Sequence, residues 1–456
     1  MDSLEKHQQG ALQVTENNLR SHASDIYSDY QKEVTMKSAT VISFRPTHTS
    51  DPYEFKIVPK AYNYVIPQAT RLGVKLKVVK GNGENLTAAD NVAPVNMLAS
   101  SLWKTIQVEI AGVPLTPMQN EYANYKAYIE NQLSYGLDAR KTHLTTYLAS
   151  QDTAGHFDDT KNTTYVDGAY TIKNDNVGFD DRKREIELSR SVFLKTPLHC
   201  DFLQSERSFP QGMAFTITLI KAPDAFLLMT NSATEKYKVV IEDIRLYIRF
   251  VEMHDEIVRE HHLLSQRVPA VMTMNKTTIR THLYAANTQD LRVENLFQGH
   301  CLPKSLIIGM VGQDAFNGHY NKNPYNFQHF GVQSAAITMF GKLIPNEPYT
   351  PNFGIANSND YMMMYRDMFD NIGILNNDFG NVITPNLFKG GMFFMAFDFS
   401  PDQCNGYHMH DANDSNINLE MMLTQPSTET IVLIAFAVYN TILRIDNTFA
   451  AEVVLT

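Results

Sequence analysis

The segment IQVEIAGVPL, residues 106–115, has the pattern of a β-strand that ends in a glycine turn at Gly112. The segment AAITMFGKLIP, residues 335–345, has the same shape, with its turn at Gly341. A Tyr-rich helical stretch begins near Tyr122 after the first segment, and a Tyr- and Met-rich one covers residues 361–369 after the second. Glycine after a run of β-prone residues indicates a tight turn. The same strand, turn and helix are therefore expected twice.

A second pair of segments keeps the same order. The strand candidate FTITL, residues 215–219, lies before Pro223, and INLEM, residues 417–421, lies before Pro426. Each precedes one more long strand. Two copies of one β-unit, each of about 200 residues, are what a duplicated sandwich leaves in a sequence. The alternative is a coincidence among common strand and turn patterns.

The sequence predicts an all-β fold of two tandem antiparallel jelly-roll β-sandwiches, a double jelly-roll, with short helices in loops. Residues 244–250 alternate apolar Ile and Leu with Arg and Tyr, which gives one buried and one wetter face. In contrast, residues 118–150 space Tyr and Leu by three or four, which predicts an amphipathic helix inserted in a loop. Further strands are expected at 40–44, 53–58, 74–79, 239–251, 306–311, 392–399 and 430–445.

Four segments are expected along the chain. Residues 1–35 are polar and form an N-terminal arm, and residues 36–253 form the first jelly-roll. Residues 254–275 are a charged linker with helical spacing, and residues 276–456 form the second jelly-roll. The length of 456 residues suits two such domains.

Composition points toward assembly rather than toward nucleic acid or membrane. Hydrophobic residues make up 43% and charged residues 19%, so partners are expected to cover much of the surface. The net charge is −10, and the first forty residues carry four Lys or Arg against six Asp or Glu. Direct nucleic-acid binding is therefore not expected. The polar start and the lack of a long apolar run predict a soluble protein made in the cytosol, with no membrane span.

Three cysteines, Cys200, Cys301 and Cys404, are too few for a disulfide framework and too far apart for paired metal ligands. His408 and His410, with Asp411 and Asp414, are spaced like ligands of a metal-binding jelly-roll, but their turn-rich surroundings favour a polar loop.

Other chemical candidates also favour structural roles. A histidine cluster, His254, His261 and His262, lies in the expected linker helix. Cys200 next to His199 could be a nucleophile, but neighbours along a strand point to opposite faces. We therefore expect no enzyme activity, no cofactor and no metal.

One aromatic loop, residues 314–327, has the composition of a recognition surface. Its rings could clasp a sugar, which would make the chain a carbohydrate-binding jelly-roll protein, or fill a groove on a neighbouring subunit. We predict intersubunit contacts for Phe316, Tyr320, Tyr325 and Phe327.

Several strings together resemble the major capsid protein of Polintons (Mavericks) and the related adintoviruses. The resemblance runs from about residue 50 to residue 447. The strings are VAPVN at 92–96, YKAYIE at 125–130, SYG at 134–136, LHCDF at 198–202, ENLF at 294–297, DAFNG at 314–318, NPYNF at 323–327 and AFD at 396–398.

This resemblance implies a structural protein with no catalytic residues. It implies two sandwiches that stand upright on an icosahedral shell around a DNA genome, and a homotrimer that forms a pseudo-hexagonal, hexon-like capsomer. Neighbouring capsomers and a single jelly-roll penton protein would be its partners. It also implies a location in the virion capsid, after synthesis in the host cytoplasm and assembly there or in the nucleus. Such a transposon-derived chain is expected to have trimer interfaces above ~2,000 Å².

Overall fold

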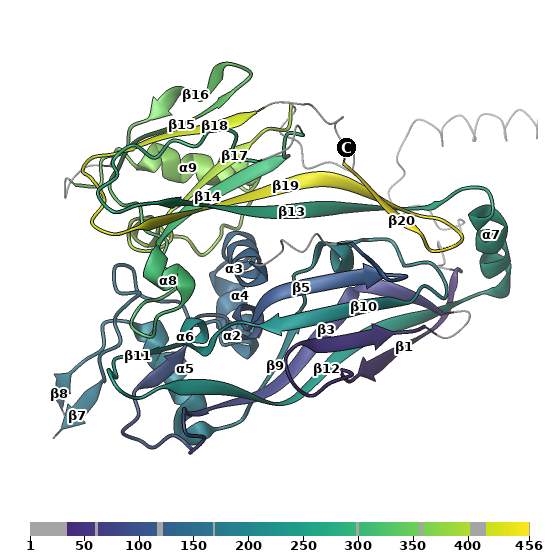
Figure 1. Cartoon of the computed structure of the whole chain (residues 1–456), viewed down its shortest axis with the longest axis horizontal. Helices are drawn as coiled ribbons and strands as arrows, with labels where there is room; N and C mark the ends of the chain where they lie inside the picture. The colour runs from purple at the N-terminus through teal and green to yellow at the C-terminus, as the bar shows by residue number, and fades with distance from the viewer. Residues whose placement is uncertain are drawn as a thin grey trace, which may run out of the picture.

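The first sandwich is built from two antiparallel sheets that face each other (Figure 1). One sheet has the order β1-β12-β3-β9 and the other the order β2-β10-β5-β6. The first comprises β1 (Met36–Phe44), β12 (Tyr237–Met253), β3 (Asn63–Lys80) and β9 (Val192–Pro197). The second comprises β2 (Tyr53–Ile57), β10 (Phe215–Lys221), β5 (Trp103–Ile110) and β6 (Val113–Pro114).

The second sandwich repeats this strand order. Its larger sheet runs β13-β19-β14-β17, and its smaller sheet runs β16-β15-β18. Short bridges from Asp290 to Met422 and from Val293 to Leu419 put residues 290–293 beside β18, where β2 lies beside β10 in the first sandwich. The strands are β13 (Ala270–Tyr284), β14 (Ser305–Gly312), β15 (Val332–Met339), β16 (Lys342–Tyr349), β17 (Phe394–Asp398), β18 (Ile417–Leu423) and β19 (Ile431–Ile445), and β20 (Ala451–Leu455) pairs with β19.

The two glycine turns that marked the duplication have the same backbone geometry. Ala111 and Gly112 have φ of 50° and 81°, and Phe340 and Gly341 have φ of 51° and 70°. Both pairs form two-residue hairpin turns, which connect β5 to β6 and β15 to β16. Positive φ at both central residues defines the turn type that matches the twist of paired strands. The predicted fold of two tandem jelly-roll sandwiches is confirmed.

The core forms because the strands alternate as the sequence indicated. In β12, Ile244, Leu246, Ile248 and Phe250 are buried, while the residues between them are wholly or partly exposed. Trp103 at the start of β5 is 1% exposed and lies edge-on to Tyr53 of β2. Alternate burial is expected of a sheet with one face on a core. Most of the buried apolar side chains of both sandwiches belong to one continuous hydrophobic cluster.

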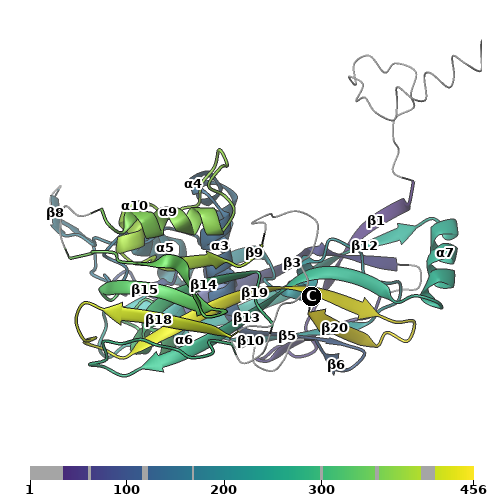
Figure 2. The same ribbon diagram turned by 90° about the horizontal axis from the view of Figure 1, so that it is seen from above.

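Helices gather at one end and in the middle of the molecule, whereas α7 (Asp255–Ser265) lies at the other end (Figures 1 and 2). The predicted helical stretch at 118–150 contains α3 (Ala123–Ser134), α4 (Leu137–Lys141) and η2 (His143–Tyr147), and the stretch at 361–369 lies in α9 (Met362–Asn371). The remaining helices are α2 (Leu98–Ser101), α5 (Val177–Ile186), η3 (Glu187–Ser189), η4 (Asp201–Gln204), α6 (Asp224–Leu227), α8 (Gln313–Asn317) and α10 (Pro385–Lys389). Short strand pairs are β4 (Val92–Pro94) with β11 (Leu228–Thr230), and β7 (Thr164–Val166) with β8 (Ala169–Ile172).

The computed structural model describes residues 34–59, 63–115, 122–166, 169–297, 301–354, 359–401 and 416–455. Almost all of the expected arm, residues 1–35, lies outside these ranges, as do Cys404, His408, His410, Asp411 and Asp414. The helix expected in the linker is α7. Strand β13 begins at Ala270, inside the segment 254–275 that was expected to be linker, because its pairing with β19 extends to Ile445.

Candidate functional site at the seam between the sandwiches

The seam between the two sandwiches brings together residues that are far apart in the sequence. Helix α3 belongs to a long connection of the first sandwich and lies against the second (Figure 1). Ten of its twelve residues are buried. The spacing at 118–150 predicts an amphipathic helix, whose polar face would be exposed to solvent. That face is covered because the second sandwich and its aromatic loop pack on it.

The aromatic loop of the second sandwich closes over α3. The rings of Tyr128 and Tyr325 are parallel, with centroids 3.9 Å apart, and Tyr125 stacks with Phe316 at 5.5 Å. The Tyr125 hydroxyl donates to the carbonyl of Pro324 at 3.1 Å. Such ring pairs add to the free energy gained by burying their area. The loop is therefore part of the connection between the sandwiches.

This packing corrects the prediction for two of the four aromatic residues. Tyr325 and Phe327 are 0% exposed, so they offer no surface to another subunit or to a sugar. Phe316 and Tyr320 are partly buried against the same core, and the Tyr320 hydroxyl donates to the carbonyl of Tyr237 at 2.9 Å. An intersubunit role for Phe316 and Tyr320 stays a prediction. A carbohydrate could not stack on Tyr325 or Phe327, so only two of the four predicted rings could contact a sugar.

A buried ion pair supports the same loop from the first sandwich. The Arg182 guanidinium of α5 donates to Asp152 at 2.7 Å, and both side chains are 0% exposed. The amide of Asn323 donates to the other Asp152 oxygen at 3.2 Å. The backbone N–H of Asn323 also donates to Asp158 at 2.6 Å, and burial raises the pKa of that carboxyl. The polar part of the loop is thereby tied to residues 152–182.

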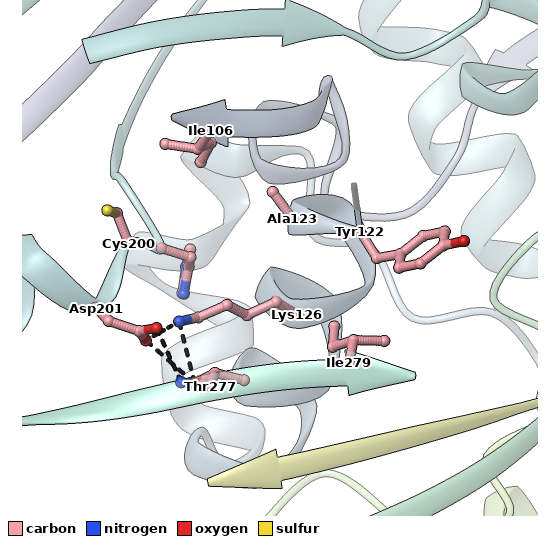
Figure 3. A pocket seen from close by; sticks show the side chains of 9 residues that line it. Ile106, Tyr122, Ala123, Lys126, Cys200, Asp201, Thr277 and Ile279 are labelled. Carbon is pink, nitrogen blue, oxygen red and sulfur yellow. Dashed lines mark hydrogen bonds and ion pairs between the residues drawn. The ribbon is translucent and has the colours of Figure 1, made fainter. Parts of the chain in front are cut away.

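A second polar centre also lies in the seam (Figure 3). Lys126 of α3 forms an ion pair with Asp201 of η4. Thr277 of β13 donates its backbone N–H to Asp201 Oδ2 at 2.9 Å, and its hydroxyl accepts from Lys126 Nζ at 3.2 Å. The side chains of Lys126 and Asp201 are 8% and 9% exposed. Three elements from both sandwiches thus meet at one buried carboxylate.

A histidine and a second carboxylate extend this centre. Glu130 lies one turn after Lys126, with 3.5 Å between Oε1 and Nζ, and its other oxygen is 2.6 Å from His199 Nδ1. Burial alone lowers the pKa of Lys126, but Asp201 and Glu130 outweigh burial and raise it above its ordinary value. Burial raises the pKa of Glu130, and Lys126 with His199 outweighs this and lowers it. The spacing of Lys126 and Glu130, four residues apart on a helix, is the pattern from which this ion pair could be predicted.

A cavity of about 20 Å³ adjoins these charges, which is room for about one water molecule. Most of its wall is apolar, and Cys200 contributes to it. Burial raises the pKa of the Cys200 thiol to about 11, so the thiol stays protonated at neutral pH. Cys200 therefore lacks the thiolate that a nucleophile needs. Lining residues are Ile106, Tyr122, Ala123, Lys126, His199, Cys200, Asp201, Thr277 and Ile279.

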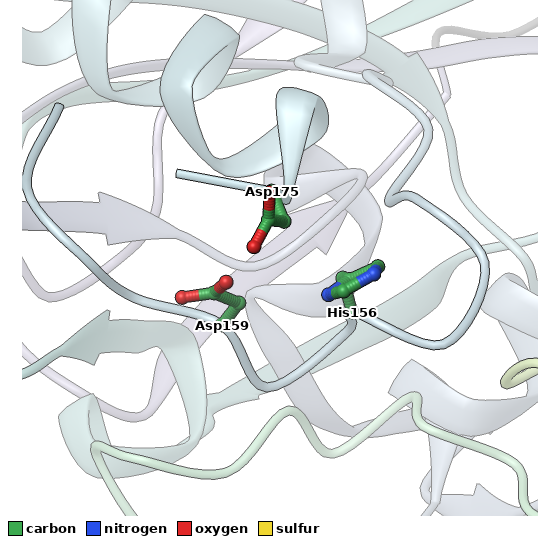
Figure 4. A group of neighbouring side chains, drawn as sticks. All are labelled: His156, Asp159 and Asp175. Carbon is green, nitrogen blue, oxygen red and sulfur yellow. The ribbon is translucent and has the colours of Figure 1, made fainter. Parts of the chain in front are cut away.

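The remaining candidates carry no chemistry that we assign. His156, Asp159 and Asp175 lie within 4.8 Å of one another at the surface (Figure 4). The ammonium of Lys161 is 3.4 Å from each of the two carboxylates and supplies the positive charge there. In α7, His261 Nδ1 is 3.0 Å from the hydroxyl of Tyr64. Among the described residues, no helix is long and apolar enough to cross a membrane.

Comparison with known proteins identifies the fold. No protein-family model matches the chain. An uncharacterised protein of Caenorhabditis elegans is 23% identical over 374 residues, which covers 79% of this chain and 83% of the relative.

Three solved structures share the arrangement of the whole chain. A chain of the Sputnik virophage has a TM-score of 0.60 at 12% identity, and the match covers 96% of this chain and 92% of that chain. For the Faustovirus major capsid protein the TM-score is 0.60 at 12% identity, with 95% and 94% covered. For the mavirus major capsid protein it is 0.52 at 10% identity, with 96% and 95% covered. The chain has the double jelly-roll fold of these proteins.

Proposed function

We propose that this chain is the major capsid protein of a DNA virus or virus-like element. In this role it forms trimers, and the trimers tile an icosahedral shell. The observation that carries the proposal is the repeated strand order of the two sandwiches, together with a fold shared over nearly the whole chain with viral major capsid proteins. The function is structural, and we propose no enzymatic activity.

The duplication suits a hexagonal lattice. Two sandwiches of the same topology give each chain two similar footprints, so three chains present six. A closed three-fold assembly can then occupy a site with six neighbours. Most of the helices gather at one end of the long strands, away from α7 (Figure 2). Loops that carry such insertions commonly form the variable contact surfaces of a fold.

The lineage and the partners are finer proposals. The strings at 92–96, 125–130, 198–202, 314–318 and 323–327 support a Polinton or adintovirus origin. A relative encoded by a nematode is consistent with an element that resides in animal genomes. A single jelly-roll penton protein, neighbouring capsomers and a location in the virion follow from that lineage.

Mass photometry of the purified full chain tests the proposal. Three chains of 51.7 kDa give a trimer of about 155 kDa, and we expect this species at nanomolar to micromolar concentration. Negative-stain images should show particles with three-fold symmetry and a pseudo-hexagonal outline. A monomer that persists at micromolar concentration contradicts the proposal. Binding to a glycan array without trimers would favour a carbohydrate-binding protein instead.

A further inference from the structure

The buried centre of Lys126, Asp201 and Glu130 combines an amine, a carboxyl group and a second acid in one water-poor site. We infer that it is the site of an intramolecular isopeptide bond, in which Lys126 Nζ becomes joined to Asp201 Cγ. This crosslink would fasten α3, the helix at the seam, to η4 of the same sandwich. The inference concerns one chain and does not depend on the proposed role in a capsid.

The reacting groups already touch. Lys126 Nζ is in contact with Asp201 Oδ1, so the amine needs no large movement to reach the adjacent carbon. Both side chains are more than nine-tenths buried. Holding two reactants in such a position converts a bimolecular reaction into a unimolecular one and removes much of its entropic barrier.

Thr277 prepares the carboxyl group for attack. Its backbone N–H donates to Asp201 Oδ2 at 2.9 Å, which fixes that oxygen as the one that carries negative charge in a tetrahedral intermediate. Its hydroxyl donates to Oδ1 at 3.1 Å. We assign Oδ1 as the leaving oxygen, because Lys126 Nζ contacts Oδ1 and can pass a proton to it directly.

Glu130 is placed to move the protons. Its Oε1 is 3.5 Å from Lys126 Nζ, and its Oε2 is held by His199 at 2.6 Å. A carboxylate at this position can take a proton from the ammonium and return it to the leaving oxygen, which is general acid–base catalysis. The raised pKa of Lys126 and the lowered pKa of Glu130 oppose the first of these transfers, so we expect the bond to form slowly after folding. Glu130 is thus the catalytic residue of the proposed reaction.

The reaction balances without any other reagent. The C–O bond to Oδ1 breaks, the bond from Nζ to Cγ forms, and the ammonium gives up two protons. Both protons leave with Oδ1 as one molecule of water. No oxidant or reductant is needed, and the two opposite charges of the ion pair disappear together.

The surroundings favour the product. Two buried charges are replaced by a neutral amide, which removes the cost of keeping an ion pair out of water. The adjoining cavity has room for about one water molecule, and Ile106, Ala123 and Ile279 line it.

The test is the intact mass of the full chain under denaturing conditions. We expect a mass lower than that of the sequence by one molecule of water. Proteolytic digestion should then yield one branched peptide that contains both Lys126 and Asp201. The full sequence mass in the folded, aged protein would overturn the inference, and so would a loss of water located elsewhere.

Variants locate the chemistry. Lys126→Met should have the full mass of its own sequence, and Glu130→Gln should form the bond roughly a hundredfold more slowly. Lys161→Met is the matched control, because Lys161 also contacts two carboxylates but is 58% exposed. Lys161→Met should lose one water as the unaltered chain does. If the buried variants fail to fold, the mass of the unaltered chain still decides, and trimer formation is measured separately.

Discussion

Single buried side chains hold the two sandwiches at a fixed distance from each other. Asp152 receives hydrogen bonds from Arg182, Asn176 and Asn323, so one carboxylate joins α5, the turn before it and the aromatic loop. Removing one member of a buried, hydrogen-bonded ion pair leaves the other charge without compensation. Residues of this kind are expected to be the most sensitive positions in the chain.

Arg182→Met should lower the free energy of unfolding by about 3–5 kcal/mol, because it leaves Asp152 charged and buried. The matched control is Arg184→Met on the same helix, where the partner is Asp181 and the side chains are 72% and 44% exposed. The control should change the free energy by less than about 1 kcal/mol. Thermal unfolding of both variants measures the difference, and equal midpoints would show that the buried pair contributes no more than the exposed one.

His329 should make stability depend on pH. Burial lowers the pKa of His329 from 6.5 to about 4, with a contribution from nearby Lys389. The folded pKa is the lower one, so the unfolded chain binds more protons between these values. Stability therefore falls as the pH drops from 6.5 toward 4, by up to about 3 kcal/mol.

Thermal unfolding from pH 7 to pH 4.5 measures this dependence. In the folded chain, His329 Nδ1 accepts a hydrogen bond from the N–H of Gly331 at 2.9 Å. The variant His329→Asn keeps an acceptor for this hydrogen bond, but its side chain does not titrate. The variant should lose less stability on acidification than the unaltered chain. Identical slopes for the two proteins would refute the role of His329.

Among the elements, the paired hairpins show how the duplication is encoded. Each turn places a residue other than glycine and then a glycine at positive φ, and the glycine adopts this conformation without the steric cost that a Cβ adds. The hairpins were predictable from Gly112 and Gly341, and so was the alternation in β12. The segment of the second sandwich that is equivalent to β2, residues 290–293, could not be predicted from the sequence, because it forms only isolated bridges and no continuous strand.

Gly112→Ala and Gly341→Ala should each lower stability by about 1 kcal/mol, because each forces Cβ into the left-handed region. Nothing lies within 4 Å of a Cβ built at either position, so the cost is conformational and should be similar in the two hairpins. Gly354→Ala is the control, since φ there is not in that region and the nearest atom is 3.7 Å away. Unequal effects of the two turn variants, measured by thermal unfolding, would mean that the hairpins are not equivalent.

At the scale of the whole molecule, the seam was the part that sequence patterns could not supply. Tyr128 and Tyr325 stack although nearly two hundred residues separate them, and neither residue has a neighbour in sequence that predicts the contact. The composition of the loop at 314–327 indicated a surface position, because aromatic and Asn residues are also common in recognition sites. The polar residues of α3 likewise resemble a solvated face. Only the placement of the second sandwich shows that both are interior.

The net charge of −10 predicts weak nonspecific binding of the whole chain to DNA. The full-length protein should show no shift of a short DNA duplex at physiological salt, because nonspecific affinity depends on phosphate neutralisation by basic side chains. An electrophoretic mobility assay from low to physiological salt tests this, with a basic DNA-binding protein as positive control. A shift that weakens steeply with added salt would show that a local basic surface outweighs the overall charge.

Within the part of the chain that the structure describes, stacked rings and buried carboxylates join the two sandwiches along the seam. A chain joined in this way behaves as one rigid unit, and the distance between its two sandwiches is fixed when it folds. In the proposed shell, any bending would then be taken up where separate polypeptides touch, so the radius of the particle would be decided outside the chain rather than within it.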